Sequence, residues 1–174
     1  MRANGTALLC LAVSLLLSAL AAATAQPSIH ISGSGAQTID VSANDLAHMP
    51  RVTVDVKDAH TGEQEHFEGV LVSDLLAKAG VALGEKLRGK GLTTYVVAHA
   101  SDGYAAVYSI AEVDPAITDN RILVADMMNG KPLGSKDGPF RIVAPADKRM
   151  ARWVRMLKAL DVESAVSPSE SSPR

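Results

Sequence analysis

Basic side chains gather near the end of the chain, around its only tryptophan. Lys148, Arg149, Arg152 and Arg155 lie close together in the sequence, and Trp153 stands among them. If Lys148 and Arg149 begin a helix, backbone N–H groups and basic side chains would converge on a phosphate or a carboxylate. The cluster therefore predicts an anion-binding site. The alternative is a charged turn exposed to solvent that binds no ligand, with Trp153 packed in the core.

Two apolar runs precede this cluster and must position it. Ile122–Met128 and Phe140–Ala144 have the composition of buried strands. We expect Lys148–Val154 to form a short helix and Arg155–Val162 to form a helical turn followed by a final strand. The connection between the two apolar runs is rich in turn-forming residues, namely Asn129-Gly130, Pro132, Gly134 and Gly138-Pro139.

Short strands and short helices are predicted for the rest of the chain. Arg51–Lys57 alternates apolar and polar residues and predicts a strand, which returns through a hairpin at Phe67. Capping-box patterns at Ser42 and Ser109 predict two helix starts. The other expected elements are strands at Gln37–Val41, Leu92–Ala100 and Tyr104–Ser109 and a helix at Val70–Ala79. The tally predicts an α+β fold, mostly β, with a mixed or barrel-like sheet.

The N-terminal segment predicts a secretory signal. Arg2 is the only charged side chain in residues 1–25, and Ala7–Ala23 is small and aliphatic. Ala23-Thr24-Ala25 has the small-x-small pattern of a signal peptidase site. We expect cleavage after Ala25, a periplasmic or secreted protein, and no membrane attachment afterwards. The alternative, an uncleaved anchor, would need a longer apolar core. Cys10, the only cysteine, would be lost with the signal.

One domain is expected after the signal. Residues 26–36 form an extended lead-in, residues 37–162 a single module, and residues 163–174 a disordered tail of Ser, Pro and Glu. The chain has 17 Lys and Arg against 19 Asp and Glu, a formal net charge of −2. This near balance argues against nucleic-acid binding and against a polybasic membrane attachment.

The densest group of metal-ligand residue types falls on the predicted hairpin after Lys57. His60 and His66, with neighbouring carboxylates, could hold zinc or copper. However, the two histidines lie on opposite sides of the turn, and charged residues at a hairpin tip are normally solvated. We therefore predict no metal site. The carboxylates concerned are Asp58, Glu63, Glu65 and Glu68.

The order of motifs resembles that of the sulfite-oxidase-type molybdopterin domain, over roughly Thr38 to Val162. Gly69–Val81 resembles the segment after that family's cofactor-ligating strand. Asp102-Gly103-Tyr104 resembles its Asp-Gly-Tyr turn, and Met128–Leu133 its Met-Asn-Gly, then Pro-Leu, stretch. Gly138–Pro145 and Arg152-Trp153 resemble its last strand and its pair of a basic residue and tryptophan.

The resemblance implies a largely β domain that binds the molybdenum pterin cofactor and catalyses oxygen-atom transfer or reduction. It places the cofactor-binding positions at Asn129, Arg141, Lys148, Arg149 and Arg152.

Three features depart from the family's pattern. In the family, a cysteine at the end of the strand before the helix ligates molybdenum, which prefers a soft thiolate. Here that strand is Val52–Val56, Lys57–His60 follow it, and no cysteine is present there. The connection to the helix and the loop Pro145–Trp153 are also shorter than in the family. We therefore expect no catalytic residue.

The expected function is that of a non-catalytic binding module for an anionic small molecule or an exported partner protein. Two alternatives remain open. One is a molybdopterin-dependent oxidoreductase with a non-cysteine ligand or a partner subunit. The other is an interaction subunit that binds no small ligand.

Overall fold

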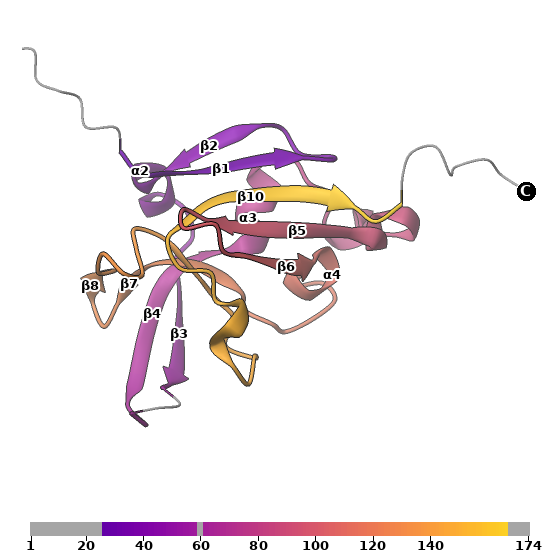
Figure 1. Cartoon of the computed structure of the whole chain (residues 1–174). Coiled ribbons are helices and arrows are strands. Elements are labelled where there is room, and N and C mark those ends of the chain that lie inside the picture. Colours follow the sequence, from indigo (N-terminus) through magenta and orange to yellow (C-terminus); the bar gives the residue numbers. More distant parts are fainter. Residues whose placement is uncertain (1–25, 59–60, 167–174) are drawn as a thin grey trace, which may run out of the picture.

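Two five-stranded sheets form the framework of the protein in a computed structural model that describes residues 26–58 and 61–166 (Figure 1). The first sheet contains β1 (Ser28–Gly33), β2 (Ile39–Ser42), β5 (Thr94–Ala100), β6 (Ala105–Ser109) and β10 (Leu157–Ser164). Its strand order is β2-β1-β10-β5-β6, and only β1 and β10 run parallel.

The second sheet is wholly antiparallel. It contains β3 (Val52–Lys57), β4 (Gln64–Leu71), β7 (Leu123–Met128), β8 (Lys131–Pro132) and β9 (Arg141–Val143). The order is β3-β4-β7-β8, and β9 also pairs with β7. The predicted α+β class is confirmed, and the two apolar runs pair with each other as β7 and β9. The described strands form two open sheets and no closed barrel.

The helices are short, and local sequence signals begin two of them. The α-helices are α2 (Ala43–Ala47), α3 (Val72–Lys78) and α4 (Ile110–Val113), and the 3₁₀ turns are η1 (Gly84–Lys86), η2 (Gly89–Thr93) and η3 (Met150–Arg152). Ser42 and Ser109 each form the predicted capping box, with Asp45 and Glu112 respectively. No helix in residues 26–58 or 61–166 is both long enough and apolar enough to cross a membrane.

A single apolar core joins the two sheets and α3. Leu75 and Leu76 of α3, Ile29 and Ile31 of β1, and Phe67 of β4 are all fully buried. Burial of such side chains stabilises the fold by roughly 1.5–3 kcal/mol each. The core therefore fixes β4, whose Phe67 contacts Arg141 of the site described below.

The expected boundaries of the module are too narrow at both ends. The lead-in, residues 26–36, is extended as predicted, but Ser28–Gly33 is strand β1, between β2 and β10. Its Ser- and Gly-rich composition hides the alternation of buried Ile29 and Ile31 with exposed neighbours. The tail also begins later than residue 163, since β10 continues to Ser164. The predicted signal and the end of the tail lie outside the described residues.

The segment after β9 differs in part from its prediction. The short helix expected at Lys148–Val154 is only the 3₁₀ turn η3, Met150–Arg152. No helical turn precedes the last strand: Met156 has a φ of 48°, and β10 starts at Leu157. The final strand is confirmed.

Candidate functional site

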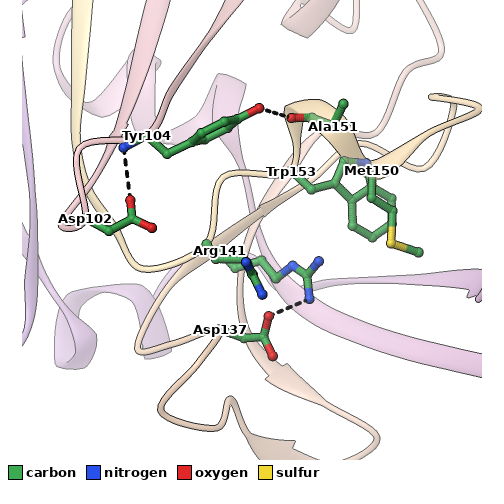
Figure 2. A pocket seen from close by; sticks show the side chains of 8 residues that line it. Asp102, Tyr104, Asp137, Arg141, Met150, Ala151 and Trp153 are labelled. Atoms are coloured by element: carbon green, nitrogen blue, oxygen red, sulfur yellow. Dashed lines mark hydrogen bonds and ion pairs between the residues drawn. The ribbon is translucent and has the colours of Figure 1, made fainter.

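A pocket of about 370 Å³ opens where η3, the end of β5 and the start of β9 come together (Figure 2). Its size lies within the range of small-molecule sites. Met150 and Ala151 of η3 and Trp153, the residue after η3, line it, so this segment forms part of the pocket wall. The lining residues are Asp102, Tyr104, Asp137, Arg141, Met150, Ala151, Trp153 and Arg155.

Arg141 is the buried charge of this pocket. It is the first residue of β9 and only 9% exposed. Its guanidinium carbon lies 5.2 Å from the ring centre of Phe67 and 5.3 Å from that of Trp153, within reach of cation–π attraction to both. Asp137 Oδ1 accepts a hydrogen bond from one terminal nitrogen at 3.1 Å. Nε is buried and has no hydrogen-bond partner among the described residues.

Burial dominates the electrostatics of Arg141. Loss of water around the guanidinium lowers the pKa of Arg141, Asp137 and Glu65 oppose this shift, and Arg155 adds to it. Arg155 therefore lies close enough to repel Arg141. It is exposed, lines the pocket, and has no ion pair with any described residue. The pocket thus holds two cations: Arg141 is paired in part, and Arg155 has no ion pair within residues 26–58 and 61–166.

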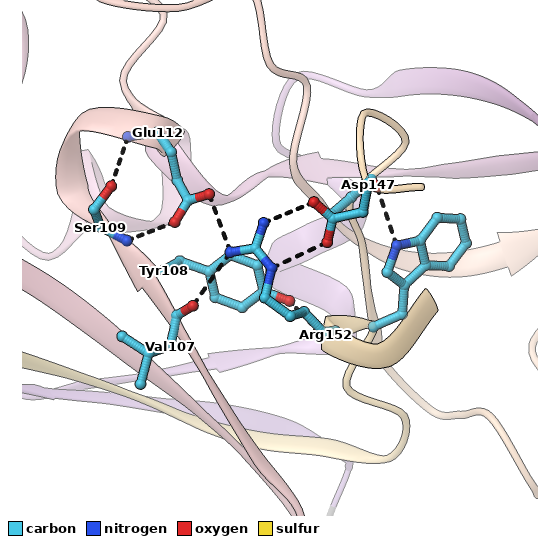
Figure 3. Close-up of polar contacts among 8 residues, drawn as sticks. Val107, Tyr108, Ser109, Glu112, Asp147 and Arg152 are labelled. Atoms are coloured by element: carbon cyan, nitrogen blue, oxygen red, sulfur yellow. Dashed lines mark hydrogen bonds and ion pairs between the residues drawn. The ribbon is translucent and has the colours of Figure 1, made fainter. Parts of the chain in front are cut away.

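Arg152, a predicted anion ligand, is instead committed to carboxylates of the protein (Figure 3). Asp147 accepts two hydrogen bonds from it, at 3.1 and 2.7 Å, and Glu112 accepts one at 3.0 Å. These bonds raise the pKa of Arg152, with the bond to Asp147 as the largest cause.

The same guanidinium also holds η3 against strand β6. Its carbon lies 4.8 Å from the ring centre of Tyr108, and Nη1, which also donates to Glu112, reaches the carbonyl of Val107 at 3.3 Å. The hydroxyl of Tyr108 donates in return to the carbonyl of Arg152. Arg152 therefore positions the loop that forms the pocket wall, and its side chain is not part of the lining.

Arg155 of the predicted basic cluster lines the pocket, whereas the remaining predicted ligands do not. Lys148 and Arg149 are exposed and do not line it. Asn129 forms the turn between β7 and β8 with a φ of 51°. Its side-chain oxygen accepts the backbone N–H of His66 at 2.9 Å, and its own backbone N–H donates to the His66 carbonyl. Of the five predicted positions, the structure brings only Arg141 into the pocket.

The β3–β4 hairpin forms as predicted. Lys57 pairs with Gln64, and neither Lys57 nor Asp58 lines the pocket. Glu65 on β4 interacts electrostatically with the pocket residue Arg141. Burial raises the pKa of the Glu65 carboxyl, and the charge of Arg141 lowers it. The described residues contain no group of three or more His, Cys, Asp or Glu that could hold a metal. His60, part of the predicted cluster, lies outside them.

Sequence reasoning missed the acidic half of the pocket. The sequence places Asp102 in a turn, Tyr104 at the start of a strand and Asp137 in a turn-rich connection, and it predicts no ligand role for any of them. Asp102 accepts the backbone N–H of Tyr104 at 2.9 Å, and the Tyr104 hydroxyl donates to the carbonyl of Ala151. The spacing of Asp137 and Arg141, four residues apart, was the one local signal of an ion pair.

This arrangement was compared with known proteins. A family model described as the oxidoreductase molybdopterin binding domain matches residues 19–171. The chain belongs to this family. No curated protein gave a match. The solved structure of the sulfane dehydrogenase SoxCD from Paracoccus pantotrophus is similar, with a TM-score of 0.62 and 19% sequence identity. The alignment covers 83% of this chain and 40% of the SoxCD chain, so this chain spans less than half of that protein.

The fold is therefore that of a sulfite-oxidase-like molybdopterin domain, as the motifs predicted. The donor set of this chain does not fit the family's metal centre. Residues 26–58 and 61–166 contain no cysteine, so they offer no thiolate for molybdenum. Arg152, which matches the basic residue before the family's tryptophan, has its donors bound by Asp147, Glu112 and Val107. Any ligand of the pocket must therefore be recognised by the side chains that line it.

Proposed function

We propose that this chain is a non-catalytic member of its family that binds a small molecule by an anionic group at Arg141. The observation that carries the proposal is the buried Nε of Arg141, a donor without an acceptor among the described residues. A buried charge with an unsatisfied donor costs free energy of folding. An anionic group against this guanidinium would remove that cost, because charge-assisted hydrogen bonds are among the strongest in proteins.

Arg155 supports the same proposal. It lines the same pocket as Arg141, and its charge lowers the pKa of Arg141. An anion between two cations relieves such repulsion and gains attraction to each. The pocket also offers apolar surface from Trp153 and Met150, which suits a small organic molecule better than an inorganic ion.

The non-catalytic part of the proposal rests on chemistry that the chain does not supply. No thiolate is available in the described residues, and the basic residue beside Trp153 is held by Asp147 and Glu112. Export to the periplasm or beyond is proposed from the apolar run Ala7–Ala23 and the small residues that follow it.

Trp153 makes the proposal directly testable, since the only tryptophan lines the pocket. Its fluorescence should be titrated with sulfate, 3-phenylpropionate and L-phenylalanine, which share an anionic group and differ elsewhere. We expect a saturable change with at least one of them. Arg155→Gln should weaken that binding about tenfold, while Arg149→Gln, a matched exposed arginine outside the pocket, should leave it unchanged. No saturable response, or equal affinity in the Arg155→Gln variant, would overturn the proposal.

A further inference from the structure

The charges that line the pocket balance one another. Arg141 and Arg155 contribute two positive charges, and Asp102 and Asp137 contribute two negative ones. Figure 2 shows the carboxylate of Asp137 against Arg141 and that of Asp102 beside the backbone of Tyr104. A ligand that enters therefore meets both signs of charge.

Both carboxylates retain acceptor capacity toward the pocket. Asp137 receives one hydrogen bond, on Oδ1 from Arg141, and Asp102 receives one, on Oδ1 from the Tyr104 N–H. The second oxygen of each carboxylate accepts no hydrogen bond from another described residue. Because an ionised carboxylate can accept about four hydrogen bonds, these oxygens can bind a donor or a cation.

This charge pattern selects against simple dianions. A phosphate or sulfate near Arg141 would also lie near two carboxylates, and like charges at close range are costly. A ligand with one anionic and one cationic end would pair with both sets of side chains. The cationic end would also gain from the rings of Tyr104 and Trp153, which line the same pocket.

We propose that the pocket binds a small zwitterion that carries one carboxylate and one ammonium group on an apolar body. The carboxylate lies against Arg141 and Arg155, the ammonium against Asp102 and Asp137, and the body against Trp153 and Met150. This inference rests on the proposed function for the anionic half of the ligand, and the ammonium half is new. An amino acid with an apolar side chain is the simplest molecule of this class.

Three compounds that share a phenylalkyl skeleton test the carboxylate and the ammonium contacts separately. L-phenylalanine carries both groups, 3-phenylpropionate lacks the ammonium, and 2-phenylethylamine lacks the carboxylate. In calorimetric titrations of the full protein, L-phenylalanine should bind at least about tenfold more tightly than either analogue. Asp102→Asn should weaken binding of L-phenylalanine and leave that of 3-phenylpropionate unchanged or tighter. Asp119→Asn, an exposed aspartate outside the pocket, is the matched control and should change neither.

The outcomes distinguish this inference from the proposed function. If 3-phenylpropionate binds as tightly as L-phenylalanine, or if Asp102→Asn weakens both equally, the zwitterion is wrong and the anion site stands. If 2-phenylethylamine alone binds, or if none of the three binds, the zwitterion is wrong. The proposed function fails with it when sulfate also gives no saturable response.

Discussion

The guanidinium carbon of Arg141 lies 5.3 Å from the ring centre of Trp153, so the buried cation of the pocket contacts the chain's only tryptophan. Phe67 meets the same tryptophan edge-on, with ring centres 5.8 Å apart. The three side chains come from β4, from β9 and from the residue after η3. The site therefore forms only when these segments pack together. The aromatic rings of Phe67 and Trp153 then contact the buried guanidinium of Arg141.

Because burial of the Arg141 charge costs stability, an apolar side chain of similar size should be tolerated at this position. Arg141→Met keeps the apolar packing against Phe67 and Trp153 and removes the desolvated charge. Because Asp137 would be left without its partner, the substitution is combined with Asp137→Asn. We expect the free energy of unfolding of this double variant to stay within about 1 kcal/mol of wild type, or to rise, while binding of the probes is lost. Denaturant unfolding and probe titration measure the two effects. A loss of more than about 3 kcal/mol would show that Arg141 is required for the fold.

Truncation at the same position provides the comparison. In the same Asp137→Asn background, Arg141→Ala removes the packing as well as the charge and should cost about 2–4 kcal/mol, as large-to-small core substitutions do. Equal stability of the Ala and Met variants would contradict the account of Arg141 as a packed side chain.

The contacts of Arg152 predict energetic coupling with Asp147. Each partner removed alone leaves the other charge half-buried and short of hydrogen bonds. Arg152→Gln should therefore cost about 1–3 kcal/mol of unfolding free energy. A double-mutant cycle with Asp147→Asn should give a coupling of about 1–3 kcal/mol. Additive effects of the two substitutions would show that the pair does not stabilise η3.

Glu65 should make the protein less stable as the pH rises. Burial is the largest cause that raises the pKa of its carboxyl, Asp58, Asp137 and Glu63 add to the shift, and Arg141 opposes it. The folded state therefore holds this proton to a higher pH than the unfolded state does. Stability contributed by the protonated form is complete below the unfolded pKa of about 4.3 and is lost as the pH rises through the folded pKa.

Glu65→Gln should accordingly be more stable than wild type at pH 7, and the difference should vanish below about pH 4. Thermal unfolding at a series of pH values measures it. A Gln variant that is less stable than wild type at neutral pH would contradict a raised pKa of Glu65 in the folded state.

Asp45 should behave in the opposite sense. Its hydrogen bonds with the side chain and backbone of Ser42 lower the pKa of this carboxyl. Its contribution to stability is present above the unfolded pKa and is lost as the pH falls through the folded one. Asp45→Asn should thus be less stable than wild type at pH 7 and converge with it in acid. A difference that persists below about pH 2 would rule out the capping-box explanation.

Elemental analysis tests the non-catalytic reading. The protein purified from cells that make molybdenum cofactor should contain far less than one equivalent of molybdenum and no pterin fluorescence after oxidation. Stoichiometric molybdenum with pterin would instead support an oxidoreductase with a non-cysteine ligand.

Local signals in the sequence were sufficient for much of the fold. The capping boxes at Ser42 and Ser109 depend on residues three positions apart, and the alternation in Val52–Lys57 depends on one face of one strand. Strand β1 was hidden because its glycines and serines weaken the pattern that buried Ile29 and Ile31 carry.

The site was harder to predict because charge pairing is not local. Arg152 belongs to a basic cluster in the sequence, yet the fold brings Glu112 from α4 against it and removes it from the pocket. Asp102 reaches the pocket from the turn after β5, and nothing in its neighbourhood marks it as a ligand. Arg141 was found by resemblance, and its burial between two rings required the assembled sheets.

The central claim is that an anionic group of the ligand binds the guanidinium of Arg141, whose Nε–H signal can be observed in ¹H–¹⁵N spectra of arginine side chains. Absence from the Arg141→Met variant assigns it. We predict that it shifts on titration with L-phenylalanine and saturates with the same dissociation constant as the Trp153 fluorescence. A saturating fluorescence change with an unmoved Arg141 signal would contradict the account.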